Sequence, residues 1–394
     1  MRLVIPICTR GVTVSRVLSS GGTRPEGSSR LGGMITGMSE TAHSPRFRPK
    51  KVYLAEPSGY CAGVYMAIKA LVWMTKIFNP PVYCYHEIVH NRFVVEAFER
   101  AGVVFVDSIE AVPQGVPVMM SAHGSAPKVL SDAGARAGIV IDSVCPLVTK
   151  IHHEVKRRAA KGFDIIFVGH EGHDEAMGTM ARAPSDMTLI EPETGLGGFE
   201  PRDPGKVALF AQTTLGMHEW EAVSTEASER FPNLVTSRKS DLCYATTNRQ
   251  EAVLAMAAEC DLILVVGSEN SSNTNALVRT ARVRGTPAHR IDSAGSISDE
   301  WLEGVRVVGV TAGASAPDHL VREVLDWLEP VEGWHLFRVT EEDEYFPLPR
   351  ELRAFLTALI SSIQVGFTAK PDGLGALEYD RRITATDALA ALEA

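Results

Sequence analysis

Two hydrophobic patterns alternate along the chain from Lys51 to about Pro330. Short runs rich in β-branched residues predict strands, and apolar positions at helical spacing between them predict helices of about 10–15 residues. This alternation is typical of βα units in parallel sheets, so we predict an α/β fold. We expect strands at 51–56, 81–87, 116–122, 138–143, 164–169, 207–212, 261–267 and 305–312, and helices at 62–77, 91–101, 147–161, 218–230, 248–259, 274–284 and 317–328.

Two loops indicate an internal repeat. The stretches "SAHGSAPKVL" (121–130) and "TAGASAPDHL" (311–320) both follow an apolar strand and both place a proline in the first helical turn, where proline is favoured. Three cysteines, Cys61, Cys145 and Cys243, each close a strand-like segment and are about one small α/β unit apart. We therefore expect repeated units.

The two ends of the chain lack this regular pattern. Residues 1–50 are rich in Ser, Gly and Arg and poor in acids, which fits a disordered tail, a start assigned too early (Met34 and Met38 follow) or, less favoured, an organelle transit peptide. We exclude this segment from the fold. The final stretch "ATDALAALEA" (385–394) is interpreted as an amphipathic helix for a subunit contact or as a frayed end, and we favour the frayed end.

Composition excludes several classes of protein. A chain of 394 residues with 45% hydrophobic and 22% charged residues is long enough for two or three globular domains. Its net charge of −9 argues against nucleic acid or an anionic membrane as partner. No apolar run approaches the roughly 18 residues of a membrane span. Six cysteines without a dense framework favour a reducing compartment, and we expect a cytoplasmic protein, with plastid import as a minor alternative.

Polar loops follow many of the predicted strands. In parallel sheets ligands collect beyond the carboxyl ends of the strands, so these loops are expected on one rim. They offer histidines, hydroxyls, amides and backbone N–H groups at helix starts, which are suited to a phosphate-bearing anion. The loops are "HEIVHN" (86–91), "SAHGSAP" (121–127), "GHEGHDEAMGT" (169–179), "AQTTLG" (211–216), "SENSSNTN" (268–275) and "TAGASAP" (311–317).

The three strand-end cysteines leave more than one interpretation open. Structural zinc usually takes closely spaced pairs such as C-x₂-C, which are absent here. An iron–sulfur cluster accepts thiolates from distant segments, and one held by three cysteines keeps an iron free for substrate. Ordinary buried cysteines are the remaining alternative. Cys8, Cys84 and Cys260 are interpreted as bystanders.

Nine ordered motifs resemble one known family. They are "GYCAGV", "HEIVHN", "SAHGS", "CPLVTKIH", "GHEGHDEAMGT", "QTTL", "CYATTNRQ", "SENSSNTN" and "TAGASAP", and they run from about Lys51 to about Arg350. Together they are similar to 4-hydroxy-3-methylbut-2-enyl diphosphate reductase, the terminal enzyme of the methylerythritol phosphate route to isoprenoids. No single motif of the set would be specific.

The resemblance implies a fold. It implies three similar small α/β domains in a trefoil around a central iron–sulfur cluster, with the N-terminal strand packed into the third domain. The boundaries expected here are 1–50 for the extension, 63–145 for the first domain, 146–241 for the second, 51–62 plus 242–335 for the third, and 336–394 for a C-terminal tail.

The resemblance also implies a cofactor and a site. The cofactor is a 4Fe–4S cluster with Cys61, Cys145 and Cys243 as ligands, and Gly59 and Gly63 let the backbone turn beside it. The substrate is an allylic diphosphate. Residues matching its binding set are His90, His123, His173, Ser271, Ser272, Asn273 and Ser315, and residues matching the catalytic set are Glu175 as proton donor and Thr213 as the hydroxyl that orients the substrate.

The implied reaction gives Glu175 a physical task. Two electrons delivered singly expel the substrate hydroxyl, which leaves as water only if it is protonated. A carboxyl that stays protonated near neutral pH needs burial or a nearby negative charge. Isopentenyl and dimethylallyl diphosphate are the products that the resemblance implies.

Tyr65 and Met66 stand where most members of the family carry an acidic–basic pair, one turn past Cys61. A non-catalytic iron–sulfur redox sensor on the same fold is therefore the main alternative, and an enzyme for another reductive dehydroxylation is the second. No nucleotide fingerprint such as G-x-G-x-x-G opens a helix here, so we expect a ferredoxin or flavodoxin as electron donor.

Overall fold

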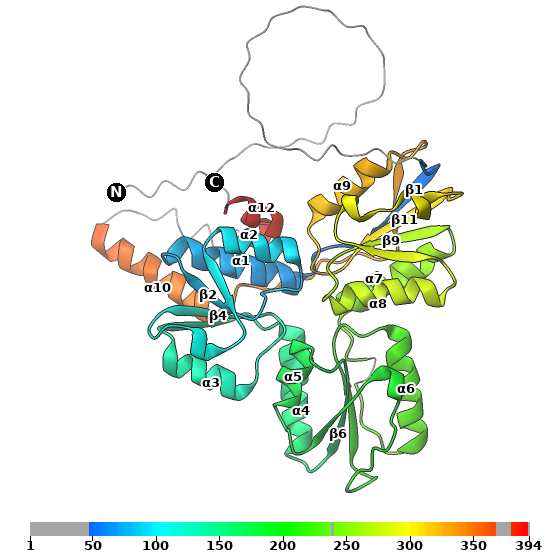
Figure 1. Cartoon of the computed structure of the whole chain (residues 1–394). Coiled ribbons are helices and arrows are strands. Elements are labelled where there is room, and N and C mark those ends of the chain that lie inside the picture. Colours follow the sequence, from blue (N-terminus) through cyan, green and yellow to red (C-terminus); the bar gives the residue numbers. More distant parts are fainter. Residues whose placement is uncertain (1–46, 238–239, 368–379, 393–394) are drawn as a thin grey trace, which may run out of the picture. The chain divides into compact units, whose positions relative to one another are not determined.

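The computed structural model describes residues 47–237, 240–367 and 380–392 (Figure 1). Within these residues, twelve strands form three sheets, and every strand pair is parallel. The predicted α/β class with parallel sheets is confirmed, whereas the trefoil arrangement and the domain boundaries stay predictions. No helix of the described residues has the length and apolar composition to cross a membrane.

The first sheet is formed by residues 82–142. Alternate residues of its strands pack on opposite faces: Val82 and Cys84 of β2 (Val82–Tyr85) contact one helical layer, and Tyr83 contacts the other. One face is covered by α1 (Ala62–Ile77), α2 (Arg92–Arg100) and α10 (Arg350–Phe367), and the other by α3 (Pro127–Arg136). The strand order is β3 (Val103–Val106), β2 (Val82–Tyr85), β4 (Pro117–Met120) and β5 (Ile139–Asp142).

The second sheet uses the same alternation. Ile166 and Leu209 face α6 (Met217–Arg230), while Ile165 and Phe167 face α4 (Pro146–Ala159) and α5 (Asp174–Met180). The strand order is β7 (Met187–Ile190), β6 (Asp164–Val168) and β8 (Val207–Ala211).

The third sheet combines the start of the described chain with its later part. β1 lies between β11 and β12, with Val52 opposite Val308 on one side and Trp334 on the other. Helices α7 (Tyr244–Ala257) and α8 (Ser272–Val283) cover one face, and α9 (Asp318–Leu328) covers the other. The strand order is β10 (Ala288–Ile291), β9 (Leu262–Val266), β11 (Val307–Ala312), β1 (Lys51–Glu56) and β12 (Trp334–Arg338).

The ordered fold begins before the expected boundary at residue 50. Phe47 packs on the hydrophobic core of the third sheet. Lys50 N–H donates to Arg306 O, and Val331 N–H donates to Pro49 O. Residues 47–50 of the expected extension therefore belong to the third sheet's domain, because their backbone is hydrogen-bonded to residues next to its strands. Residues 1–46, including Cys8, lie outside the described residues.

The expected frayed C-terminus is wrong. Helix α12 (Ala385–Ala390) packs on α1, where Ala385 is fully buried and Leu389 joins the first core. An ion pair holds the segment: Lys69 Nζ of α1 is 3.0 Å from Asp380 Oδ2, and both side chains are buried. Tyr345 OH donates to the same oxygen over 2.7 Å. The C-terminal segment is therefore part of the first core, covering the helix that begins beside Cys61.

Lys69→Met is expected to lower the free energy of unfolding by about 3 kcal/mol, because it leaves the Asp380 carboxylate buried without its cation. Urea denaturation measures this change. The control is Lys128→Met, which removes an exposed pair with Asp132 and should cost less than about 1 kcal/mol. Equal effects of the two substitutions would contradict the assignment of Asp380 as a buried anchor.

Candidate active site

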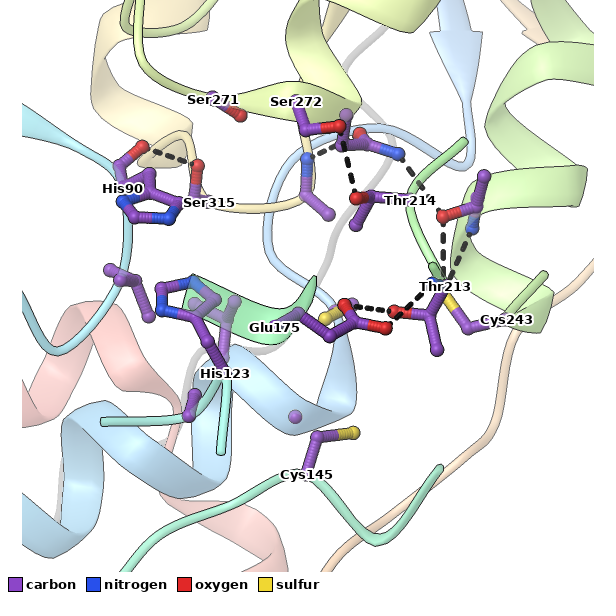
Figure 2. A pocket seen from close by; sticks show the side chains of 18 of the residues that line it. His90, His123, Cys145, Glu175, Thr213, Thr214, Cys243, Ser271, Ser272 and Ser315 are labelled. Atoms are coloured by element: carbon purple, nitrogen blue, oxygen red, sulfur yellow. Dashed lines mark hydrogen bonds between the residues drawn. The ribbon is translucent and has the colours of Figure 1, made fainter. Parts of the chain in front are cut away.

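The loops at the carboxyl ends of the strands surround one pocket (Figure 2). Thiols, imidazoles, hydroxyls and one carboxyl line it, and they come from all three sheets and their helices. Every predicted site residue lies in this lining, namely Cys61, Cys145, Cys243, His90, His123, His173, Glu175, Thr213, Ser271, Ser272, Asn273 and Ser315.

Each pocket cysteine caps a helix. Cys61, Cys145 and Cys243 are the N-cap residues of α1, α4 and α7. The N-terminal turn of a helix carries partial positive charge and free N–H groups, which favours thiolate. Of the three side chains, that of Cys243 also makes a capping hydrogen bond, in which Sγ accepts from Thr246 N–H at 3.3 Å. The backbone therefore directs three positive helix ends toward the sulfur atoms.

Two glycines make room for this arrangement. A Cβ added to Gly63 would lie 3.0 Å from Cys145 Sγ and 3.8 Å from Cys61 Sγ, so a side chain there would crowd both sulfurs. Gly59 has φ of +72°, a conformation that L residues with side chains rarely adopt. The expectation that these glycines allow a close turn agrees with this geometry.

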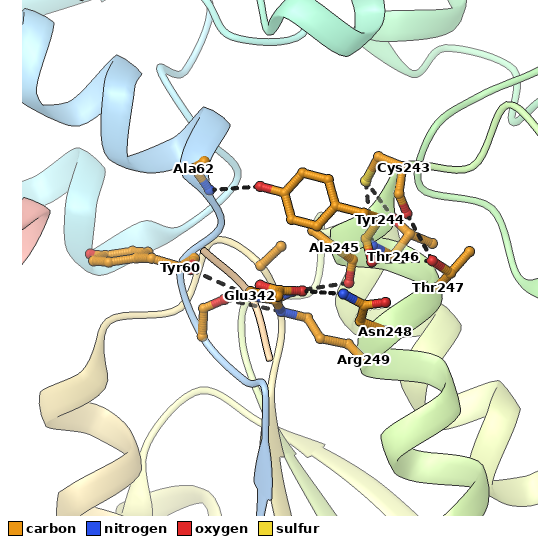
Figure 3. Close-up of polar contacts among 12 residues, drawn as sticks. Tyr60, Ala62, Cys243, Tyr244, Ala245, Thr246, Thr247, Asn248, Arg249 and Glu342 are labelled. Atoms are coloured by element: carbon orange, nitrogen blue, oxygen red, sulfur yellow. Dashed lines mark hydrogen bonds and ion pairs between the residues drawn. The ribbon is translucent and has the colours of Figure 1, made fainter. Parts of the chain in front are cut away.

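A buried arginine ties the Cys61 loop to the Cys243 helix (Figure 3). Arg249 of α7 is 1% exposed and donates to Gly59 O at 2.8 Å, while its Nη1 is 2.9 Å from Glu342 Oε1. Ala62 N–H, in the first turn of α1, donates to Tyr244 OH at 3.3 Å. These contacts fix the two cysteine-bearing segments relative to each other. Sequence reasoning missed Arg249, although it lies within the quoted motif "CYATTNRQ".

Burial makes two of the pocket thiols, those of Cys145 and Cys243, harder to ionise. Burial, then the neighbouring Cys61, raises the pKa of Cys145, and the same causes raise the pKa of Cys243 to about 11. Three crowded sulfurs can be thiolates together only beside a positive group, so this donor set fits a metal centre. Cys84 and Cys260 lie outside the pocket lining, as expected for bystanders.

The histidines form a compact group on one side of the pocket. The His90 and His123 rings stack in parallel with centroids 4.0 Å apart, and His173 meets both edge-on. Burial lowers the pKa of His123 well below its ordinary value and lowers the pKa of His173 to about 4. His173 Nδ1 accepts from Glu175 N–H at 3.1 Å, so the neutral ring carries its proton on Nε2.

His90, His123 and Asp174 each have a potential metal-ligand atom, and these three atoms lie within 4.8 Å of one another, close enough to bind one ion. The parallel stack argues against such an ion, because the in-plane lone pairs of two stacked imidazoles cannot converge on one point. Asp174 Oδ1 is already bonded to His86 Nδ1 at 2.6 Å. The group is therefore better suited to an anion.

Glu175 is a buried acid bonded to a hydroxyl. It is 2% exposed and accepts Thr213 N–H on Oε1 and Thr213 O–H on Oε2, each at 2.7 Å, as Figure 2 shows. Burial raises its pKa from 4.5 to about 7, against the opposing effect of these hydrogen bonds. The pair can therefore hold a proton inside the pocket near neutral pH.

The remaining hydroxyls and amides link the rims of the pocket. Ser315 O–H donates to His90 O at 2.9 Å, and Ala314 N–H donates to the Asn273 side chain at 3.0 Å. Ser272 Oγ lies 3.0 Å from Thr214 Oγ1, a lining residue that sequence reasoning missed although it follows Thr213 directly. This network holds the polar groups in place around the cavity.

Tyr65 and Met66, the two departures noted above, are accommodated by packing. Met66 is 3% exposed, and the Tyr65 ring meets Tyr60 edge-on with centroids 5.6 Å apart. Tyr65 packs against the first core, which also takes Leu389 of the C-terminal segment. Uncharged residues at positions 65 and 66 therefore suit a helix whose surface is covered by the C-terminal segment.

Parallel α/β sheets whose loops bring three thiols, three histidines and a buried acid into one pocket define a class of protein suited to a thiolate-bound metal group beside an anion. The model of the family described as LytB protein matches residues 52–329, and the chain belongs to this family. The family predicted from the motifs is thereby confirmed.

Relatives named 4-hydroxy-3-methylbut-2-enyl diphosphate reductase include those of Streptomyces avermitilis, 45% identical over 82% of this chain and 95% of its own length, and of Mycobacterium leprae, 48% identical over 77% and 93%. Among solved structures, the E-1-hydroxy-2-methyl-but-2-enyl-4-diphosphate reductase from Plasmodium falciparum is similar, with a TM-score of 0.76 and 31% identity over 79% of this chain and 99% of that one.

Glu175→Gln is expected to stabilise the protein by much more at pH 8 than at pH 5. The folded-state pKa of about 7 exceeds the ordinary 4.5, so wild-type stability falls as pH rises between these values and stays low above them. The amide keeps the acceptor and cannot ionise, so its gain at pH 8 is about 3 kcal/mol. Urea denaturation at both pH values measures it.

The control is Glu96→Gln, an exposed partner of Arg92 that should change stability by less than about 0.5 kcal/mol at either pH. The same effect of Glu175→Gln at both pH values would show that Glu175 does not hold a proton in the folded protein.

Proposed function

We propose that this protein reduces 4-hydroxy-3-methylbut-2-enyl diphosphate to isopentenyl and dimethylallyl diphosphate, the last step of the methylerythritol phosphate pathway. The observation that carries the proposal is the shared pocket, in which three thiols, the Glu175–Thr213 pair and the histidine group face the same cavity. The names of the relatives support the substrate and the reaction.

Cys61, Cys145 and Cys243 would hold a 4Fe–4S cluster. Their fit rests on the crowding at Gly63 and on the three helix N-termini that favour negative charge at the sulfurs. When bound, such a cluster supplies electrons one at a time and an iron without a protein ligand that can receive an oxygen. Three cysteine ligands would leave one iron of the cluster without a protein ligand, and this iron would be open to the substrate hydroxyl.

The diphosphate would lie against the histidine side of the pocket. His173 donates through Nε2 even as a neutral ring, because its Nδ1 accepts from Glu175 N–H. Hydroxyls and the amide complete the set, and the N-terminal turn of α8, which Ser271 caps, adds backbone N–H groups. The proposed binding residues are His90, His123, His173, Ser271, Ser272, Asn273 and Ser315.

Glu175 and Thr213 would deliver the proton that converts the leaving hydroxyl into water. The reaction consumes two electrons and two protons, one of which leaves in the water while the other ends on carbon. Thr213 O–H donates to Oε2 in the structure. When Oε2 carries the proton, the bond would reverse so that Oε2–H donates to Thr213 Oγ1, which frees the Thr213 hydroxyl hydrogen to face the substrate. Burial raises the pKa of the carboxyl to about 7, so near neutral pH a large share of the protein carries this proton before substrate arrives.

The sensor alternative explains less of the pocket. A redox sensor needs the cluster ligands, but it has no use for a buried acid whose pKa is raised to about 7 and which is bonded to a hydroxyl. An enzyme for another reductive dehydroxylation would use the same acid. Comparing turnover of different allylic diphosphates would distinguish it from the proposed reductase. We propose the cytoplasm as the location and a ferredoxin or flavodoxin as the electron donor.

The deciding experiment is oxidation of reduced methyl viologen by the anaerobic, cluster-loaded protein on addition of 4-hydroxy-3-methylbut-2-enyl diphosphate. Turnover with formation of both five-carbon diphosphates is expected, with a rate that falls as pH rises above about 7 because Glu175 loses its proton. Glu175→Gln should bind the substrate and lose at least about 100-fold in rate. No turnover by fully loaded protein would favour the sensor.

Cys145→Ser is expected to lower bound iron and to abolish turnover, because a serine hydroxyl is a poor ligand for iron–sulfur clusters. Iron content after anaerobic reconstitution measures the first effect. Cys260→Ser is the matched control, since Cys260 lies at the helix-to-strand junction before β9 and should leave iron unchanged. Full iron content in Cys145→Ser would remove the ligand assignment.

A further inference from the structure

An acid lies behind each of the two stacked histidines. Glu87 Oε2 is 3.3 Å from His90 Nδ1, and Asp174 Oδ2 is 3.7 Å from His123 Nδ1. His90 and His123 line the pocket, whereas neither carboxylate does. Each ring therefore has one nitrogen, Nδ1, near an acid, which leaves Nε2 for the ligand.

Both acids are held by a further residue. Asn270 Nδ2 donates to Glu87 Oε2 at 2.8 Å. His86 Nδ1 bonds Asp174 Oδ1 at 2.6 Å, and this contact raises the pKa of His86 while the same bond keeps the pKa of Asp174 low. His86 has φ of +58°, a costly conformation for a residue with a side chain, at the end of β2. A strained backbone thus presents an imidazole to an acid outside the pocket.

Stacking and burial oppose charge on the rings. Two imidazolium rings with centroids 4.0 Å apart repel each other, and burial lowers the pKa of His123. A neutral ring that directs Nδ1–H toward an acid has a lone pair on Nε2, which repels a phosphate oxygen. His123 Nδ1 is buried and has no hydrogen-bond partner in the described residues, and Asp174 Oδ2 at 3.7 Å is the acid that faces it.

We infer that Glu87 and Asp174 make the diphosphate site take up protons: when the anion binds, His90 and His123 each carry two, with Nδ1–H toward the carboxylate and Nε2–H toward a phosphate oxygen. This inference rests on the proposed function. The added protons come from solvent, one to each ring that is neutral before binding. The acids are positioning residues that act through the histidines.

The charges around the pair explain the direction. Asp174 lies between His86 and His123, so its carboxylate faces one imidazole outside the pocket and one that lines it. Binding coupled to proton uptake weakens as pH rises, by about tenfold per pH unit for each proton taken up. The titratable groups that face the two rings and their acids are Tyr85, His86, Asp107, His173, Glu87 and Asp174.

The inference predicts an effect of unusual sign. A carboxylate near an anion site should weaken anion binding by repulsion, so its removal would ordinarily tighten binding. If Asp174 acts through His123, its removal weakens binding instead. The direction of the change therefore separates a positioning role from a nearby charge.

The test is binding of inorganic diphosphate to the cluster-loaded protein, by calorimetry at pH 7 in two buffers of different ionisation enthalpy. Wild type should bind with proton uptake. Asp174→Asn should take up about one proton fewer and bind about tenfold more weakly. Glu110→Gln is the matched control, because it removes an exposed acid bonded to Ser108 without touching the histidines, and it should bind as wild type does.

Unchanged or tighter binding by Asp174→Asn, with the same proton uptake, would overturn the inference and leave the proposed function standing. Failure of the wild type to bind diphosphate would overturn both. If Asp174→Asn does not fold, Glu87→Gln provides the same test at His90, with the same loss of one proton expected.

Discussion

Three cysteines from separate parts of the chain line one pocket, and much of the structure serves to bring them there. Each cysteine caps a helix that starts at the carboxyl edge of a parallel sheet, so chain direction alone points three positive helix ends inward. Burial raises the pKa of Cys145 and Cys243, so neighbouring thiolates at these positions require a positive group beside them. The Arg249–Glu342 pair, buried beside the Cys61 loop, keeps this arrangement in register.

The electrostatics of the pocket are local. A chain with a net charge of −9 gains no general attraction for a diphosphate. The site instead combines backbone N–H groups, imidazoles with acids behind them, and an acid that burial keeps protonated. Burial acts in opposite directions on the two residue types, since it favours the neutral form of both: it retains a proton on Glu175 and removes one from His173. One buried pocket can therefore hold a carboxyl that tends to keep its proton close to imidazole rings that tend to lose theirs.

Much of this could be predicted from the sequence. The apolar runs predict the central strands and two edge strands, β5 and β8. They miss β3, β7, β10 and β12, which are all edge strands with partly exposed residues. Ordered motifs carried all the candidate site residues. Contacts between distant segments, such as Lys69 with Asp380 and Arg249 with Glu342, leave no local pattern, so the C-terminal segment and the residues behind the pocket emerged only from the structure.

The position of β1 has a consequence for biosynthesis. Cys61 directly follows a strand that pairs with β11 and β12, and its loop is fixed by Arg249 and, through it, by Glu342. The ribosome synthesises residue 61 long before residues 307–342, so the sheet that positions Cys61 is incomplete until those residues have been added. Closure of the pocket, and with it any insertion of a metal centre, therefore belongs to the end of translation or later.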